Sequence, residues 1–71
     1  MSDYPFGALL GTDMERLDYK VGRLNYTLYN VHVVGESELS LHVRATEIVG
    51  DGGQLVDRWI ARWAVKEVFF A

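Results

Sequence analysis

The chain has 71 residues, of which 49% are hydrophobic, and it carries a formal net charge of −3 and no cysteine. A chain of this length forms one domain, residues 1–71, and buries only about 60% of the surface that its unfolded form exposes. The composition excludes disulfides and thiolate metal sites, and the acidic balance argues against a broad electrostatic grip on long nucleic acid. So much apolar surface in so short a chain favours self-association.

Residues 1–11 are expected to form a loosely held N-terminal arm that ends at Gly11. The arm has no basic lead and no long apolar run, so it is not typical of a secretory signal, and no stretch of the sequence approaches a membrane span. We therefore expect a cytoplasmic protein without a membrane partner. We expect the chain to be encoded by the cell or by a phage or mobile element within it.

The segment after the arm has features of a helix. Thr12 and Glu15 match the form of a capping box, in which the two side chains satisfy the first free N–H groups of a helix. Met14, Leu17 and Val21 follow with a helical spacing, and a glycine comes directly after them. The sequence predicts a short helix at residues 13–21.

From residue 23 onward, apolar and polar side chains alternate, which is the period of a β-strand. The pattern predicts strands at residues 23–34 and 38–49, with a polar turn between them and a bulge near Leu28 and Tyr29. Placing Val33 opposite Leu39 makes one face of this hairpin uniformly apolar. The glycine-rich turn at residues 50–53 then favours a second hairpin.

Residues 54–68 fit either an amphipathic helix or a strand. Tryptophan, isoleucine, valine and phenylalanine suit a strand better, and a strand allows Ala45 to lie opposite Trp59 and Glu38 opposite Lys66. The predicted fold class is therefore mainly β (small α+β): a three-stranded antiparallel meander, residues 23–34, 38–49 and 54–68, preceded by the short helix.

A three-stranded sheet with apolar groups on both faces and two open edges favours association with another chain. We expect a homo-oligomer, a dimer or larger, that also binds another protein as an inhibitor or accessory subunit. Tryptophan is enriched at interaction hot spots, and aromatic residues near a chain end indicate docking. The candidate protein-binding residues are Trp59, Trp63, Phe69 and Phe70.

The alternative is a module that binds a nucleotide-like or other anionic small molecule. The strand model gathers basic and aromatic side chains on the second face of the sheet, where arginine can bind phosphate or carboxylate through two hydrogen bonds and tyrosine can stack on a base. These candidate ligand-binding residues are Tyr26, His42, Arg44, Arg58, Arg62 and Lys66.

The sequence offers little for catalysis or metal binding. Ser40 is expected opposite His32, but no carboxylate is placed to orient that histidine. His32 and His42 share a face, yet a metal site needs three or four ligands. We expect no metal, no cofactor and no enzymatic activity, and a catalytic site at an oligomer interface is the weakest of the three functional hypotheses.

Overall fold

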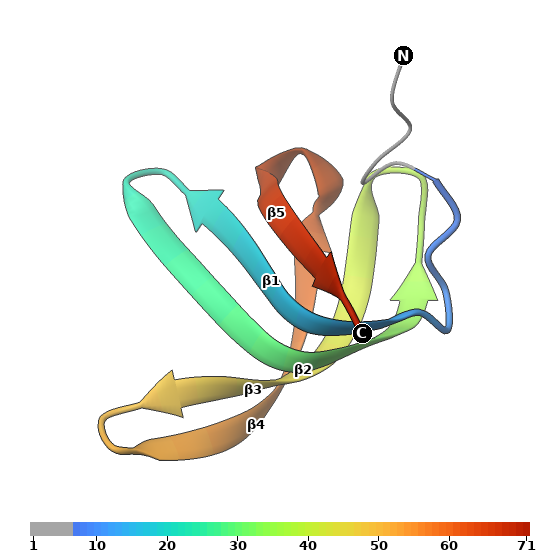
Figure 1. Ribbon diagram of the computed structural model, residues 1–71. Helices are drawn as coiled ribbons and strands as arrows, with labels where there is room; N and C mark the ends of the chain where they lie inside the picture. Colours follow the sequence, from blue (N-terminus) through green and yellow to red (C-terminus); the bar gives the residue numbers. More distant parts are fainter. Residues whose placement is uncertain (1–6) are drawn as a thin grey trace.

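The computed structural model describes residues 7–71, which form one antiparallel sheet with strand order β4-β3-β2-β1-β5 (Figure 1). The fold is therefore mainly β. In chain order, the elements are β1 (Asp13–Val21), β2 (Leu24–Glu36), β3 (Ser40–Val49), β4 (Gly52–Ala61), the 3₁₀ turn η1 (Arg62–Ala64) and β5 (Val65–Phe70). Among residues 7–71, no helix has the length and apolar character needed to cross a membrane.

The sheet curls because its longest strand bends. The 13 residues of β2 pair with β1 on one side and with β3 on the other. The β2–β3 register shifts between Tyr29 and His32, close to the predicted bulge, and Asn30 has a φ of 51°. A bulge increases twist locally. The β1–β2 and β3–β4 hairpins consequently project in different directions in Figure 1.

The core lies on the concave side of this curled sheet. Leu17, Leu28, Val31, Leu41 and Val43 are fully withdrawn from solvent. The other buried apolar residues come from the arm, strands β1 to β4 and η1; they are Leu9, Met14, Tyr19, Val33, Ala45, Ile60 and Ala64.

The predicted helix at residues 13–21 is wrong, because this segment is strand β1. The misleading feature is the three-residue spacing between two inward side chains, Met14 and Leu17, which face Val31 and Leu28 of β2. The β1–β5 register shifts between Met14 and Arg16. An irregularity that adds a residue between inward positions imitates the first turn of a helix.

The predicted three-stranded meander is also incomplete. The meander has four strands, β1 to β4, and the predicted strand at residues 54–68 is two strands separated by η1. The preference for extended structure over a helix is confirmed on both sides of that turn. The chain turns at Arg62–Ala64 and crosses to the opposite edge of the sheet, where β5 pairs with β1.

Both predicted registers are wrong. Val33 faces Val43 instead of Leu39, and Ala45 faces Val56 instead of Trp59. The second error is an odd number of residues, so it exchanges the two faces of β4. The expected Glu38–Lys66 pair is wrong as well, because β5, which contains Lys66, pairs with β1.

Part of the predicted arm, residues 1–6, lies outside the described residues. From Gly7 onward the arm follows the β2 side of the molecule. Leu9 is buried, and its N–H donates to Oε1 of Glu36 over 2.9 Å. The N–H of Gly11 donates to the carbonyl of Val33, also over 2.9 Å. These contacts fix the entry of the chain into β1.

Candidate interaction surface

From Leu55 to Ile60, strand β4 alternates exposed with more buried side chains. Ile60 is 3% exposed and joins the core, and Arg58 points to the same concave side. The outward positions are Leu55, Asp57 and Trp59, with Leu55 85% and Trp59 62% exposed. Large apolar side chains therefore lie on the outer face of an edge strand, outside the core.

Trp59 is held in place by its neighbour on β3. The rings of His42 and Trp59 stack with centroids 4.7 Å apart and planes inclined by 14°. Nε2 of His42 lies 3.4 Å from Oδ1 of Asp57, and Nε of Arg44 donates to the same oxygen over 3.2 Å. The indole is thus exposed but supported on one side by a ring that is itself positioned by a carboxylate.

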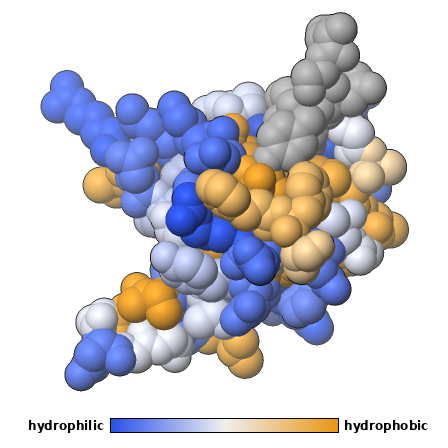
Figure 2. Space-filling view, viewed as in Figure 1, coloured by the Kyte–Doolittle hydropathy of each residue, from blue (hydrophilic) through white to orange (hydrophobic). Residues whose placement is uncertain are grey.

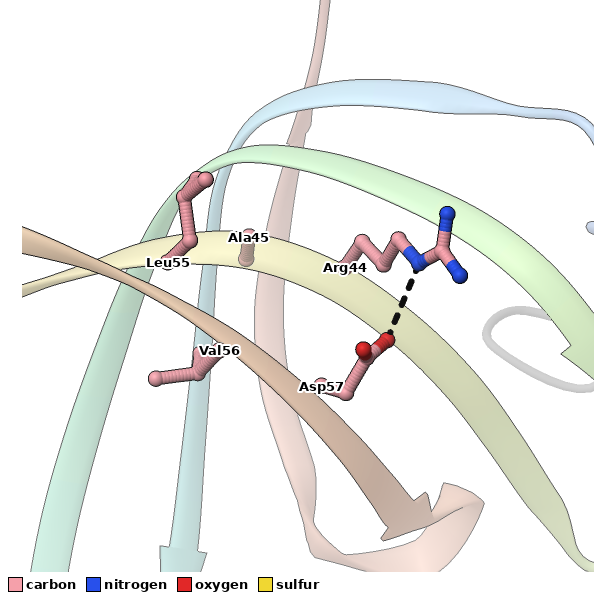
Figure 3. Close-up of a pocket in the computed structure, with 5 residues that line it drawn as sticks. All are labelled: Arg44, Ala45, Leu55, Val56 and Asp57. Carbon is pink, nitrogen blue, oxygen red and sulfur yellow. Dashed lines mark hydrogen bonds and ion pairs between the residues drawn. The ribbon is translucent and has the colours of Figure 1, made fainter.

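A surface pocket of about 310 Å³ lies beside this cluster, across the β3–β4 ladder (Figure 3). In Figure 3 the Arg44–Asp57 pair lies to one side and Leu55 to the other, while Ala45 and Val56 form the rung between them. The pocket thus has apolar walls from Ala45, Leu55 and Val56 and a polar wall from the Arg44–Asp57 pair.

Trp63 is exposed because η1 turns it outward. Its neighbours Arg62 and Ala64 are 4% and 3% exposed, whereas Trp63 is 73% exposed. The 3₁₀ turn therefore buries the residues on both sides of the indole. Trp59 and Trp63 together give the end of β4 and the following turn two large aromatic groups open to solvent.

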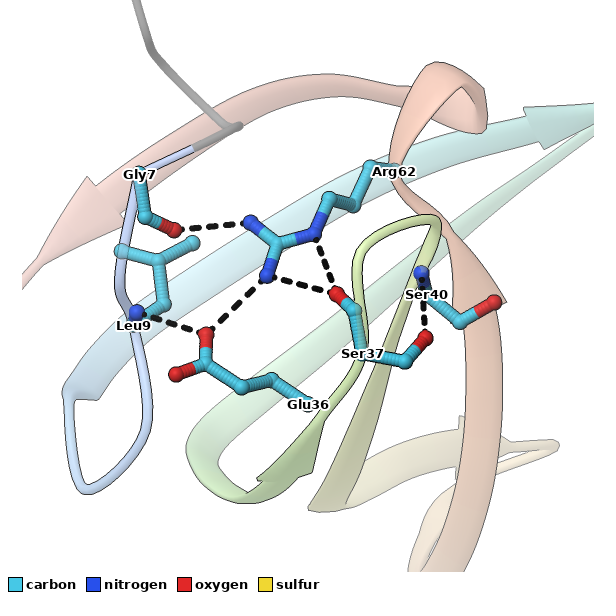
Figure 4. A network of polar contacts seen from close by, with 6 residues as sticks. All are labelled: Gly7, Leu9, Glu36, Ser37, Ser40 and Arg62. Atoms are coloured by element: carbon cyan, nitrogen blue, oxygen red, sulfur yellow. Dashed lines mark hydrogen bonds and ion pairs between the residues drawn. The ribbon is translucent and has the colours of Figure 1, made fainter.

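Arg62 lies in a closed polar network (Figure 4). Its guanidinium donates to the carbonyl of Ser37 through Nε and Nη2, over 3.1 and 2.9 Å. It also donates to the carbonyl of Gly7 over 2.7 Å and to Oε1 of Glu36 over 3.0 Å. The N–H of Leu9 and then the Arg62 guanidinium hold the pKa of Glu36 below its ordinary value, although partial desolvation opposes this. The network joins the arm, the β2–β3 turn and η1.

Arg58 lies in a second network on the concave side. It donates to both carboxylate oxygens of Glu47, over 2.9 and 2.7 Å, and to the hydroxyl of Tyr19 over 2.9 Å. Hydrogen bonds to Tyr19 and to Glu47, in that order, raise the pKa of Arg58. The ring of Tyr19 stacks on Tyr26 at 4.9 Å. Arg58 thus joins β4 to the neighbouring β3 and to β1.

The phenylalanines of β5 lie at the other edge of the sheet. Phe69 and Phe70 are 37% and 50% exposed, and the guanidinium of Arg16 lies 4.2 Å from the centroid of the Phe69 ring. Lys66 is exposed on the same strand. In Figure 2, apolar surface covers much of the region of β5, and a hollow separates the β1–β2 hairpin from the β3–β4 hairpin.

The residues predicted to bind an anion do not share one face. His42 and Arg44 lie on the outer face, whereas Arg58 lies on the concave side near the Tyr19–Tyr26 stack. Arg62 lies in the buried network and Lys66 on β5. Across the β3–β4 ladder, His42 faces Trp59 and Arg58 faces Val43, so consecutive positions of β4 point to opposite faces.

The predicted Ser40–His32 pair is wrong too. Ser40 faces Ala61, and Nδ1 of His32 contacts Oδ1 of Asp13. In the part of the chain that the structure describes, no three histidine or acidic side chains cluster in a way that would hold a metal ion.

Sequence reasoning overlooked several residues of these sites. Leu55, Glu36, Glu47 and Tyr19 each contribute to a surface or network described above. A signal for Leu55 was present: once Ile60 is assigned to the core, strand alternation places Leu55 outside. Glu36 and Tyr19 gave no such signal, because their partners come from segments far away in the sequence.

Comparisons with protein-family models, curated proteins and solved structures found no match to this chain.

Proposed function

We propose that this chain is a non-enzymatic interaction protein. It binds another protein through an aromatic surface formed by the outer side of β4 and by η1, as an inhibitor or accessory subunit, and it works as a homo-oligomer in the cytoplasm. The observation that carries the proposal is the exposure of two tryptophans, Trp59 at 62% and Trp63 at 73%, at the edge of a sheet whose core is complete without them.

Tryptophan exposure of this extent favours a binding role on energetic grounds. An aromatic side chain buries roughly 150–250 Å² when it is covered, and tryptophan is enriched among residues that dominate binding energy. The stack with His42 restrains the Trp59 ring before any partner arrives. Less side-chain entropy is then lost on binding, so the ring serves as a preorganised anchor.

The residues around Trp59 supply a matching polar rim. Asp57, Arg44 and His42 lie beside it and already contact one another. A partner with an apolar side chain for the indole and a few hydrogen-bonding groups for this rim fits the general pattern of an apolar centre with a polar border.

The proposal is tested by comparing what the immobilised protein captures from host lysate with what variants capture. We expect Trp59→Ala and Trp63→Ala to lose the same captured protein, which is then identified and purified for calorimetry. Each truncation should weaken its affinity by about 2 kcal/mol or more, which is roughly 30-fold. The matched control is Leu24→Ala, which removes an apolar side chain that is 62% exposed on β2. Capture that is identical in all four proteins contradicts the proposal.

The alternative, binding of a nucleotide-like anion, has less support. Arg44 lies with Asp57, Arg58 with Glu47 and Arg62 with Glu36. An anion would have to displace a carboxylate from each arginine it contacts. A bound ligand raises the melting temperature, so a thermal-shift panel of nucleotides and inorganic phosphate tests this alternative. We expect no shift.

A further inference from the structure

The two edges of the sheet differ in how open they are to another strand. Strand β5 has six residues, and its pairing with β1 shifts register twice. It also carries the exposed charged residues Lys66 and Glu67. Short length, irregular pairing and charge are the features by which natural proteins prevent one sheet edge from pairing with another. The β5 edge is therefore protected.

Strand β4 has none of these protections. Its ten residues pair with β3 over an unbroken register from Gly52 to Ala61, and it contains neither proline nor lysine. Its two charged side chains are held by the protein itself, Asp57 by Arg44 and Arg58 by Glu47. Within residues 7–71, β4 pairs with β3 alone. An edge strand directs alternate N–H and C=O groups outward, and these groups need a partner or water.

We propose that β4 pairs with β4 of a second copy, antiparallel and about a twofold axis at Asp57. This register places Leu55 of each copy opposite Trp59 of the other, on the outer face. Leu55 and Trp59, the two most exposed apolar side chains of β4, then lie side by side across the junction. Aromatic–aliphatic pairs directly opposite on antiparallel strands are stabilising. The occupant of the edge is a second copy because the edge complements itself in this way.

Neighbouring registers match less well. An axis at Arg58 would set two guanidinium groups opposite each other and leave Leu55 facing Ala61. An axis at Leu55 would set Asp57 against Gly53. In the proposed register the two Asp57 carboxylates do meet, but each already lies within 3.4 Å of Nε2 of His42 and 3.2 Å of Nε of Arg44 in its own copy. The like charges on the axis are thus compensated.

This inference rests on the self-association included in the proposed function, and not on partner binding by the tryptophans. The pairing produces one continuous sheet of ten strands with the outer faces of both copies on the same side. The two Trp63 side chains then belong to one dimeric surface. A partner with two equivalent sites would bind such a surface with higher overall affinity, because binding at the first site raises the effective concentration of the second.

The absence of native cysteine allows a direct test of the register. In the proposed dimer, Asp57→Cys lies on the axis and forms an intermolecular disulfide with itself under mild oxidation. Leu55→Cys lies about 14 Å along the strand from its own symmetry mate, beyond disulfide reach, and does not. A mixture of Leu55→Cys and Trp59→Cys forms the mixed disulfide. Self-linking of Leu55→Cys that exceeds that of Asp57→Cys overturns the register.

Native mass spectrometry and light scattering test the dimer itself. The 8.1 kDa chain should give twice that mass at micromolar concentration. Leu55→Lys places a charge at the junction and should raise the dimer dissociation constant by at least about tenfold, whereas Leu24→Lys, on β2, should not. A wild-type monomer at all concentrations, or a dimer indifferent to Leu55→Lys, overturns the proposal. Trp63→Ala should weaken partner capture but should still form the dimer in native mass spectrometry. This variant therefore distinguishes failure of the dimer inference from failure of the partner-binding proposal.

Discussion

The guanidinium of Arg62 and the carboxylate of Glu36 lie 3.0 Å apart, with the arginine side chain 5% and the glutamate side chain 21% exposed. Strands β3 and β4 lie between the two residues in the sequence, so the contact is a long-range one. Their pair closes the molecule at the point where η1, the β2–β3 turn and the arm meet (Figure 4). The Arg62 guanidinium therefore links η1 to the arm, to the end of β2 and to the β2–β3 turn.

Replacing Arg62 should destabilise the fold. Arg62→Met leaves the Glu36 carboxylate and the carbonyls of Ser37 and Gly7 without these donors, so the free energy of unfolding should fall by more than the loss of an exposed pair would cause. The matched control is Arg44→Met, which removes an exposed pair worth less than about 1 kcal/mol. Urea unfolding measures both. Equal losses in the two variants would show that the Arg62 network is not a main support.

Acid should weaken the same contact. The pKa of Glu36 is lower in the folded state than in the unfolded chain, because the Leu9 N–H and Arg62 favour the carboxylate. As the pH falls, the unfolded chain therefore takes up the proton first, so this contribution to stability is present above the ordinary pKa of glutamate and is lost as the pH falls through the lowered pKa of the folded state. Glu36→Gln should be less stable than wild type at pH 7, and the difference in urea midpoint should shrink towards pH 3. A difference that stays constant with pH would contradict this assignment.

Truncation of two adjacent residues on β4 should destabilise the protein by different amounts. Ile60→Ala opens a cavity in the core and should cost about 2–5 kcal/mol. Trp59→Ala removes a larger side chain but mainly the stack with His42, which is worth about 1 kcal/mol. Chemical unfolding at low protein concentration, where self-association does not contribute, makes the comparison. A larger loss for Trp59→Ala would mean that the two faces of β4 are exchanged.

The bend in β2 should depend on the residue at position 30. Asn30 has a φ of 51°, a backbone conformation that asparagine and glycine tolerate and β-branched residues do not. Asn30→Val should destabilise the protein by about 1–2 kcal/mol, and Asn30→Gly should be close to neutral. Thermal unfolding distinguishes them. If valine were tolerated as well as glycine, the bend would not require this conformation.

The extended character of residues 24–61 was predictable because strand alternation is a local signal. The β2–β3 and β3–β4 hairpins and the irregularity in β2 follow from alternation and turn residues. The β1 segment was not predictable in this way, because the inward pair Met14 and Leu17 is separated by three residues, a spacing that a helix also produces. Burial against β2 overrides the local helix signal of Thr12 and Glu15.

The faces of β4 were not predictable because pairing register depends on packing across the sheet. Ala45 with Trp59 is as plausible in the sequence as Ala45 with Val56. Only the position of Ile60 against Leu41 in the core decides between them. The candidate tryptophans could therefore be named from the sequence, whereas the exposure that makes them a surface required the register. The turn at η1 is non-local as well, since Arg62 finds its partners on other segments.

The position of β5 has a consequence for how the chain reaches this structure. Strand β5 pairs with β1, so β2, β3 and β4 lie in the loop that must close before it gains a partner. Closing such a loop is slow, whereas the three hairpins of the meander form from neighbouring residues. Until β5 docks, Leu17 lacks its neighbour Val68 and the backbone of β1 is open along one side. Refolding at high concentration is therefore the stage at which this chain is most prone to aggregate.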